Sequence, residues 1–128
     1  MVKKVHRGDL VEFEGGFTAR FTGLKAPALN EFLGSEVYDF TRREIEGKLV
    51  AVFTYTTNNL ASGIVYDEEG YPLVQIKYGK NLIISINELL LRKGYARVDE
   101  KYLPADLEYF KNLEKEAQDY KLGIWNIK

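Results

Sequence analysis

Cysteine is absent from the sequence, and histidine occurs once, at position 6. Without thiols the chain forms no disulfide, no thiolate zinc site and no cysteine nucleophile. With one histidine it can build neither a histidine-based nucleophile triad nor a metal site of several histidines. We expect His6, which lies close to the N-terminus, to be solvated rather than catalytic.

Long apolar runs and a charge surplus are missing as well. No stretch approaches the ~18 apolar residues of a membrane span, and "MVKKVHRGDL" lacks the apolar segment of a signal peptide. We therefore expect a soluble protein with no membrane partner, and the cytoplasm is favoured. The 18 basic and 19 acidic residues nearly balance, whereas tight nonspecific nucleic-acid binding usually needs a basic surplus.

What the sequence does contain is typical of one globular domain. Of its 128 residues, 45% are hydrophobic and 29% are charged. A chain of this length and composition can bury a core without disulfides or a structural metal ion. No repeat, linker or low-complexity segment divides it. We expect a single domain over residues 1–128.

Alternation of apolar and polar residues predicts several strands. The β-rich runs lie at residues 10–14, 17–24, 48–55, 61–67 and 71–78. The pair Gly15-Gly16 predicts the turn of a hairpin between the first two runs. The last three runs suggest a meander, and Pro72, which has no N–H, belongs at a strand start or edge.

Two segments carry end signals of helices. Residues 36–46 follow Ser35, a plausible N-cap, and precede Gly47, a plausible stop. A short helix follows Ser85, which forms an S-x-x-E capping box with Glu88.

A third, longer helix is predicted to begin near Pro104. Its apolar residues recur every three or four positions and comprise Leu103, Leu107, Phe110, Leu113, Ala117, Tyr120 and Ile124. The order of strands, helix, strands, short helix and long helix predicts a mainly β, α+β fold. A small barrel of the OB type, with helices packed against it, fits this order better than a βαβ sheet.

Five motifs occur in a characteristic order along the chain. They are "RGDLVEF" (7–13), "RFTGLKAP" (20–27), "FTRREIEGK" (40–48), "INELLLRKGYARV" (86–98) and "EKEAQDYKLGIW" (114–125). As an ordered set they resemble the staphylococcal nuclease-like (SNase-like, thermonuclease) family. The resemblance covers nearly the whole chain and implies an OB barrel of five strands with three helices.

The resemblance also implies a chemistry, namely phosphodiester hydrolysis with one Ca²⁺ held by carboxylates, a glutamate that activates water and two arginines on the phosphate. Asp9 matches the first metal-ligand aspartate, and Arg20 matches the first arginine. The second aspartate is replaced by Lys25, the glutamate by Ala28 and the second arginine by Tyr71. We therefore expect neither metal binding in the family manner nor family-type catalysis.

Other positions add to this expectation. Glu68 and Glu69 stand where the family tends to show a lysine and a tyrosine facing phosphate, and carboxylates there would repel it. Glu31 is the nearest replacement for the missing glutamate, but it lies three positions further on. Tyr102 matches a position where the family can offer a tyrosine to the nucleotide.

Each retained residue also has an ordinary structural interpretation. Asp9 fits a turn or surface acid, and Arg20 fits either a buried ion pair or a phosphate contact. Lys25 is a candidate partner for Asp9 or another nearby acid. Tyr102 is of a kind common before helices, and Trp125 fits a core residue that anchors the last helix.

The first functional hypothesis is a non-catalytic binding module without a cofactor. Degenerate domains of this kind occur in Tudor staphylococcal nuclease proteins, which implies contact with RNA or protein. We expect a protein or single-stranded nucleic acid as the partner, and near-zero net charge favours protein. A modest basic patch could come from Arg20, Lys25, Lys77 and Lys80.

Two alternatives remain. One is a Ca²⁺-dependent nuclease with a rearranged site built on Asp9, Arg20 and either Glu31 or Glu68. The other is a structural or self-associating module that uses the apolar face of the last helix or an open barrel edge. The sequence leaves the oligomeric state open.

Overall fold

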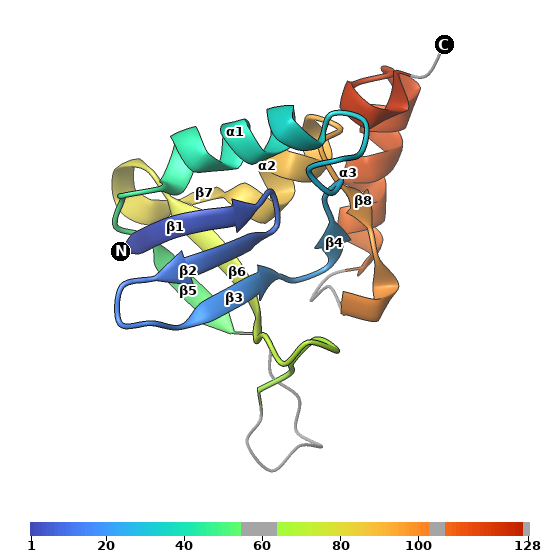
Figure 1. Ribbon diagram of the computed structural model, residues 1–128. Helices are drawn as coiled ribbons and strands as arrows, with labels where there is room; N and C mark the ends of the chain where they lie inside the picture. Colours follow the sequence, from blue (N-terminus) through green and yellow to red (C-terminus); the bar gives the residue numbers. More distant parts are fainter. Residues whose placement is uncertain (55–63, 103–106, 127–128) are drawn as a thin grey trace.

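In the part of the chain that the structure describes, the fold is mixed α+β with three α-helices, as the sequence predicts (Figure 1). The computed structural model describes residues 1–54, 64–102 and 107–126, except for the side chain of Tyr102. The strands are β1 (Val2–Arg7), β2 (Leu10–Phe13), β3 (Thr18–Phe21), β4 (Leu24–Lys25), β5 (Ala51–Thr54), β6 (Leu73–Tyr78), β7 (Ile84–Ser85) and β8 (Arg97–Val98). The helices are α1 (Gly34–Ile45), α2 (Ile86–Arg92) and α3 (Leu107–Asp119), with short 3-10 turns η1 (Lys80–Leu82), η2 (Glu100–Tyr102) and η3 (Gly123–Trp125).

The main sheet has the strand order β1-β2-β3-β6-β5, and β7 pairs with β6. Neighbouring strands run antiparallel except β3 and β6, which are parallel and place Arg20 opposite Leu73. A separate two-stranded ladder joins β4 to β8. In Figure 1 α1 lies over the β1–β2–β3 side, while α3 stands beside β4 and β8.

A closed five-stranded barrel is not what the described ladders form. No ladder in the described part of the chain pairs β1 with β5, the two ends of the sheet path. Instead, Val2 donates to the carbonyl of Lys48 at 3.1 Å and accepts from the N–H of Gly47 at 2.8 Å. The expected barrel strand at residues 17–24 is interrupted, because its end separates as β4 and pairs with β8.

Strand β1 was not predicted from the sequence, and its irregular register explains why. Its pairing with β2 shifts between Val2 and Lys4 and again between Val5 and Arg7. Bulges of this kind break the two-residue alternation that identifies a strand. Val2 and Val5 are consequently buried three positions apart, with exposed lysines between them.

The hairpin prediction is confirmed, since β2 and β3 pair across Gly15-Gly16, both with positive φ. Pro72 precedes β6, as expected. The predicted strand at 61–67 is not a regular strand over its described part, where Ile64 and Tyr66 lie in bridges and Tyr66 pairs with Pro72. Residues 55–63 lie outside the described residues, and so does part of that prediction.

The two shorter helices test the capping predictions. Helix α1 begins earlier than expected, and its N-cap is Leu33 with φ 63°, without a side-chain cap. Ser35 therefore lies inside the helix, and its predicted capping role is wrong. Helix α2 follows the prediction, because Ser85 Oγ accepts from the N–H of Glu88 at 3.2 Å.

The last helix packs by backbone contact as well as by its apolar face. Phe110, Leu113 and Ala117 are buried, whereas Tyr120 is 72% exposed and does not join the predicted face. After α3 the chain passes Gly94, whose carbonyl accepts from the N–H of Ile124 at 2.7 Å. Gly94 and Gly123 face each other so closely that a Cβ on either would overlap the other segment's backbone. Pro104 and Leu103 lie outside the described residues.

One main core cluster connects these elements. Its largest fully buried side chains include Phe21, Leu24, Ile45, Ile76, Ile86, Leu90 and Leu91. They come from both halves of the chain, so the sheet and all three helices share this core. Within the described residues, no helix is long and apolar enough to cross a membrane.

Asn87 is the buried polar residue that ties α2 to the sheet. Its amide donates to the carbonyls of Thr22 at 3.2 Å and Val74 at 3.1 Å, and its Oδ1 accepts from the N–H of Ile76 at 3.1 Å. Asn87→Ala should lower the free energy of unfolding by about 2–4 kcal/mol, because a buried N–H loses its acceptor. Urea denaturation measures this change. Asn112→Ala, at an exposed position of α3, is the control, and equal stability of the two variants would contradict the assigned role.

Candidate functional site

The site is built around the turn between β1 and β2, where Gly8 and Asp9 pass under α1. A Cβ on Gly8 would come within 2.6 Å of the Val37 side chain, so only glycine allows this close approach. The carbonyl of Gly8 accepts from the hydroxyl of Thr41 at 2.9 Å. The helix thereby fixes the turn, and Asp9 is directed into the protein rather than towards solvent.

Asp9 and Arg20 form a buried ion pair. Arg20 Nη2 donates to Asp9 Oδ2 at 3.1 Å, and both side chains are 3% exposed. The same oxygen accepts from the N–H of Ala26 at 3.0 Å, and the backbone carbonyl of Asp9 accepts from Phe21 N at 2.9 Å. Asp9 lies in a turn, as one sequence alternative has it, but it is buried rather than at the surface, and the buried structural ion pair is present for Arg20.

A second carboxylate, Asp67, faces the same guanidinium. Its Oδ2 lies 3.8 Å from Arg20 Nη1, and its side chain is fully buried. Its other oxygen accepts from the N–H groups of Glu69 at 2.9 Å and Tyr71 at 2.8 Å, which closes the turn before β6. Sequence reasoning missed Asp67, although "DEEG" carries the usual sign of an aspartate that caps its own turn.

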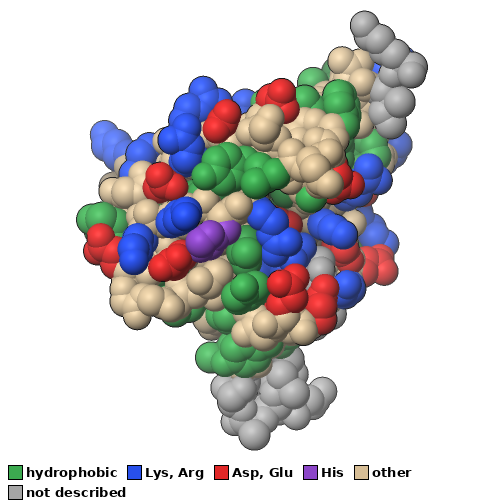
Figure 2. Space-filling view, in the orientation of Figure 1, with side chains coloured by type: hydrophobic (Ala, Val, Ile, Leu, Met, Phe, Trp, Pro, Cys, Tyr) green, Lys and Arg blue, Asp and Glu red, His purple; other side chains and the backbone are tan. Residues whose placement is uncertain are grey.

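Around this pair lies a cavity of about 200 Å³ that gathers most of the predicted site residues. It is lined by Arg7, Asp9, Arg20, Lys25, Ala26, Ala28, Glu31, Glu68 and Glu69. Its rim carries both signs of charge, because Arg7 pairs with Glu69 at 4.0 Å and Lys101 pairs with Glu68 at 3.0 Å. Figure 2 shows basic and acidic side chains interspersed over the face of the molecule that it draws.

Lys25 and Glu31 line this cavity and are both exposed. Lys25 is exposed, and within the described residues it forms no ion pair; Asp9 is already held by Arg20. The expected pairing of Lys25 with Asp9 is therefore wrong. The carboxylate of Glu31 accepts from the N–H of Ala28 at 2.7 Å, so this glutamate closes its own loop.

The remaining predicted residues lie elsewhere. Tyr71 is half-buried, and its side chain does not line the cavity. Tyr102 ends η2, and its side chain lies outside the described residues. Lys77 lies over the ring of Phe53, 5.5 Å from its centroid. Because Arg20 is buried, it adds nothing to the basic patch suggested with the surface lysines.

Of two further predictions, one holds in part and the other needs correction. His6 lies in β1 and keeps 35% of its side chain exposed, and its ring is 2.9 Å from Glu12 across the β1–β2 ladder. This hydrogen bond lowers the pKa of Glu12. Trp125 is only half-buried, and the guanidinium of Arg97 lies 5.4 Å from its ring centroid. Its neighbour Ile124 supplies the buried contact.

The donor set does not fit a calcium ion. Ca²⁺ takes six to eight oxygen ligands, and no cluster of three or more His, Cys, Asp or Glu suited to a metal occurs in the described ranges. One oxygen of Asp9 already serves Arg20 and Ala26, and the ammonium of Lys25 lines the same cavity. A cation placed there would meet positive charge on two sides.

Comparison with known proteins gives the family of the chain. The fold and the site define a small α+β domain with a buried arginine–aspartate centre beside a polar cavity. A family model described as staphylococcal nuclease homologue matches residues 18–127, and the chain belongs to that family. A region of 104 residues is 30% identical to an uncharacterized protein of Bacillus anthracis, covering 75% of this chain and 42% of that relative. The chain thus spans less than half of that relative's length.

Replacing Arg20 by methionine should strongly destabilise the fold. The change leaves Asp9 and Asp67 buried without the guanidinium, and breaking a buried pair from one side costs about 3–5 kcal/mol. Urea denaturation measures the loss. Arg42→Met, at a half-exposed residue paired with Asp39 on the surface, should cost less than about 1 kcal/mol. Similar stability for both variants would contradict the structural role of Arg20.

Replacing Lys25 by alanine should leave the fold intact or slightly more stable. Lys25 lies directly opposite Arg97 in the β4–β8 ladder, and like charges in opposed positions are destabilising by a few tenths to about 1 kcal/mol. Thermal unfolding of the wild type and the variant is the measurement. A clear drop in melting temperature would mean that Lys25 has a stabilising partner.

Proposed function

We propose that this chain is a catalytically inactive SNase-like domain of the OB-barrel type, and that it acts as a binding module for protein or single-stranded nucleic acid. The observation that carries the proposal is the buried pair of Arg20 with Asp9. The arginine that a nuclease of this family would use on phosphate is only 3% exposed here and faces two carboxylates. A phosphate would have to displace them.

Electrostatics at the rim support the same conclusion. Catalysis by phosphoryl transfer depends on preorganised positive charge at the place where negative charge develops. Glu68 and Glu69 line the cavity and are themselves neutralised by Lys101 and Arg7. The open surface therefore offers no excess of cationic donors for a scissile phosphate, and Tyr71 supplies no second guanidinium.

A Ca²⁺-dependent nuclease with a rearranged site is the competing proposal. One observation favours it, namely that Asp9, Arg20, Glu31 and Glu68 line the same cavity. It requires Asp9 to leave Arg20, and it requires Glu31 to leave the N–H of Ala28. Both requirements count against it.

The purified chain should not cleave nucleic acid. We expect no cleavage of single-stranded DNA or RNA above background with CaCl₂ or with EDTA, because the guanidinium of Arg20 is engaged and a lysine occupies the metal-ligand position. Gel electrophoresis of labelled oligonucleotides is the measurement, with an active nuclease of the family as the positive control. Thermal unfolding should likewise show no Ca²⁺-dependent shift, since a bound ligand raises the melting temperature by mass action.

Cleavage of nucleic acid by the purified chain would contradict this proposal, and two variants would show whether the rearranged site is responsible. Ca²⁺-dependent cleavage that is lost in Glu31→Gln or Glu68→Gln, with wild-type folding of both variants, would establish the rearranged nuclease. Both residues are exposed, so these substitutions separate chemistry from stability in a way that substitution of Asp9 does not.

A further inference from the structure

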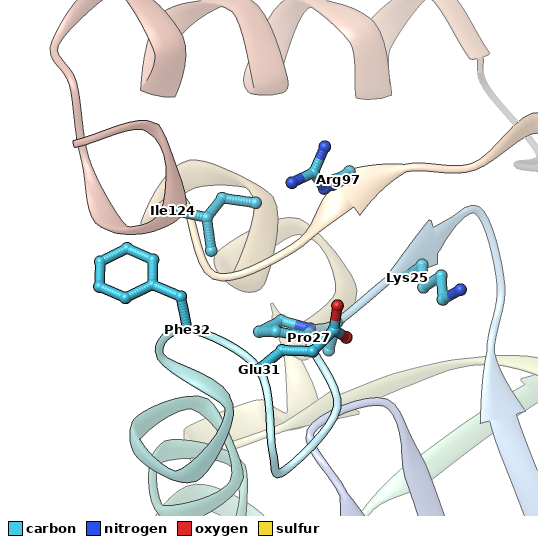
Figure 3. Close-up of a pocket in the computed structure, with 7 residues that line it drawn as sticks. Lys25, Pro27, Glu31, Phe32, Arg97 and Ile124 are labelled. Carbon is cyan, nitrogen blue, oxygen red and sulfur yellow. The ribbon is translucent and has the colours of Figure 1, made fainter. Parts of the chain in front are cut away.

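A larger cavity, of about 540 Å³, adjoins the site and shares Lys25, Ala26 and Glu31 with it. Its other lining residues are Pro27, Phe32, Arg97 and Ile124. Figure 3 shows Phe32 and Ile124 together at one end, Lys25 at the other end, and Pro27 and Arg97 between them. The cavity is thus apolar at one end and cationic towards the other.

The two cations come from one face of a short ladder. Lys25 on β4 and Arg97 on β8 are direct cross-strand partners, so their side chains leave the same face, while Leu24 and Val98 pack towards the core on the other. Both cationic residues are exposed, and within the described residues neither forms an ion pair. Opposed like charges cost stability, and the ring of Trp125, 5.4 Å from the Arg97 guanidinium, offsets only part of that cost. An anion bound in the cavity beside these two residues would offset more of it.

The apolar end is held open by its own loop. The N–H of Ala28 donates to the carboxylate of Glu31 at 2.7 Å, and the N–H of Glu31 donates back to the carbonyl of Ala28 at 2.9 Å. This closed turn places Phe32, which is 64% exposed, just before the N-terminus of α1. A large apolar side chain of a ligand could pack against Phe32 and Ile124 without first ordering the loop.

Charge balance selects the kind of ligand. The lining carries two cations and one carboxylate, and Glu31 therefore leaves room for a single anionic group. Glu68 and Glu69 line the adjoining cavity, where the next phosphate of a nucleic acid would meet them. A ligand with one carboxylate and one large apolar group matches both ends of the cavity.

From this arrangement we infer that the cavity binds a short peptide segment in which an aspartate or glutamate lies next to a large apolar residue. The inference rests on the proposed binding function and names its partner as protein. The carboxylate takes charge-assisted hydrogen bonds from Lys25 and Arg97. The apolar side chain packs on Phe32 and Ile124.

The test is selection of a random hexapeptide display library on the immobilised whole chain, followed by fluorescence polarisation with the selected peptides. We expect sequences that place Asp or Glu beside Phe, Leu, Ile or Trp. Lys25→Gln and Arg97→Gln should each weaken binding about tenfold, as expected for loss of one charge-assisted contact. Phe32→Ser should weaken binding similarly, whereas Lys25→Arg, which keeps the positive charge, should retain most of the wild-type affinity.

Matched controls are available on the same chain. Lys48→Gln and Leu49→Ser change an exposed lysine and an exposed apolar residue outside the cavity, and they should leave affinity unchanged. The inference is overturned if no peptide is enriched, if the enriched peptides lack the acid–apolar pair, or if the control variants lose as much affinity. It is also overturned if a labelled ten-residue oligo(dT) or oligo(U) binds in a Lys25-dependent way while peptides do not.

These outcomes are distinct from failure of the proposed function. Ca²⁺-dependent cleavage would overturn the proposal that the domain is inactive, whatever the result of the peptide selection. Selected peptides whose binding ignores Lys25, Arg97 and Phe32 would leave a binding module standing and remove this cavity as its site.

Discussion

The site depends on the ion pairs of the buried Arg20 guanidinium. It joins Asp9, in the turn between β1 and β2, to Asp67, in the turn before β6. Backbone hydrogen bonds reinforce the junction, since Arg20 donates to the carbonyl of Pro72 and Phe21 donates to that of Asp9, both at 2.9 Å. Charges buried this deeply are tolerated only when they are paired and hydrogen-bonded. The three segments must therefore form together.

This arrangement separates two roles that a catalytic site would combine. Asp9 and Arg20 are almost fully buried and serve one another, while Lys25, a few residues further along the chain, is exposed. A residue that matches a catalytic position is thus not evidence of catalysis when its hydrogen-bonding capacity is used inside the protein. Conversely, Lys25 at the rim forms no ion pair within the described residues, so its charge is available to a ligand.

Local signals in the sequence predicted local structure well. The Gly15-Gly16 turn, the Ser85 cap and the position of Pro72 follow from backbone preferences within a few residues. The sequence did not predict strand β1, because its bulges break the alternation of apolar and polar residues. It did not predict the pairing of Asp67 with Arg20 either, because these residues lie far apart in the chain. Family resemblance located Asp9, Arg20 and the substituted positions, but burial, which decides what they do, is a property of the assembled fold.

The lysine at position 25 links the two cavities in physical terms. In the pattern that the sequence resembles, a carboxylate at this position would hold a cation, and an ammonium reverses the sign of the field there. At an effective dielectric constant of about 20, two unit charges 4 Å apart interact by about 4 kcal/mol. That term opposes a metal ion and favours an anion at the same point. With Arg97 opposite on β8 and Phe32 nearby, the residue that is hardest to reconcile with a nuclease is also the one that gives the adjoining cavity its preference for a carboxylate.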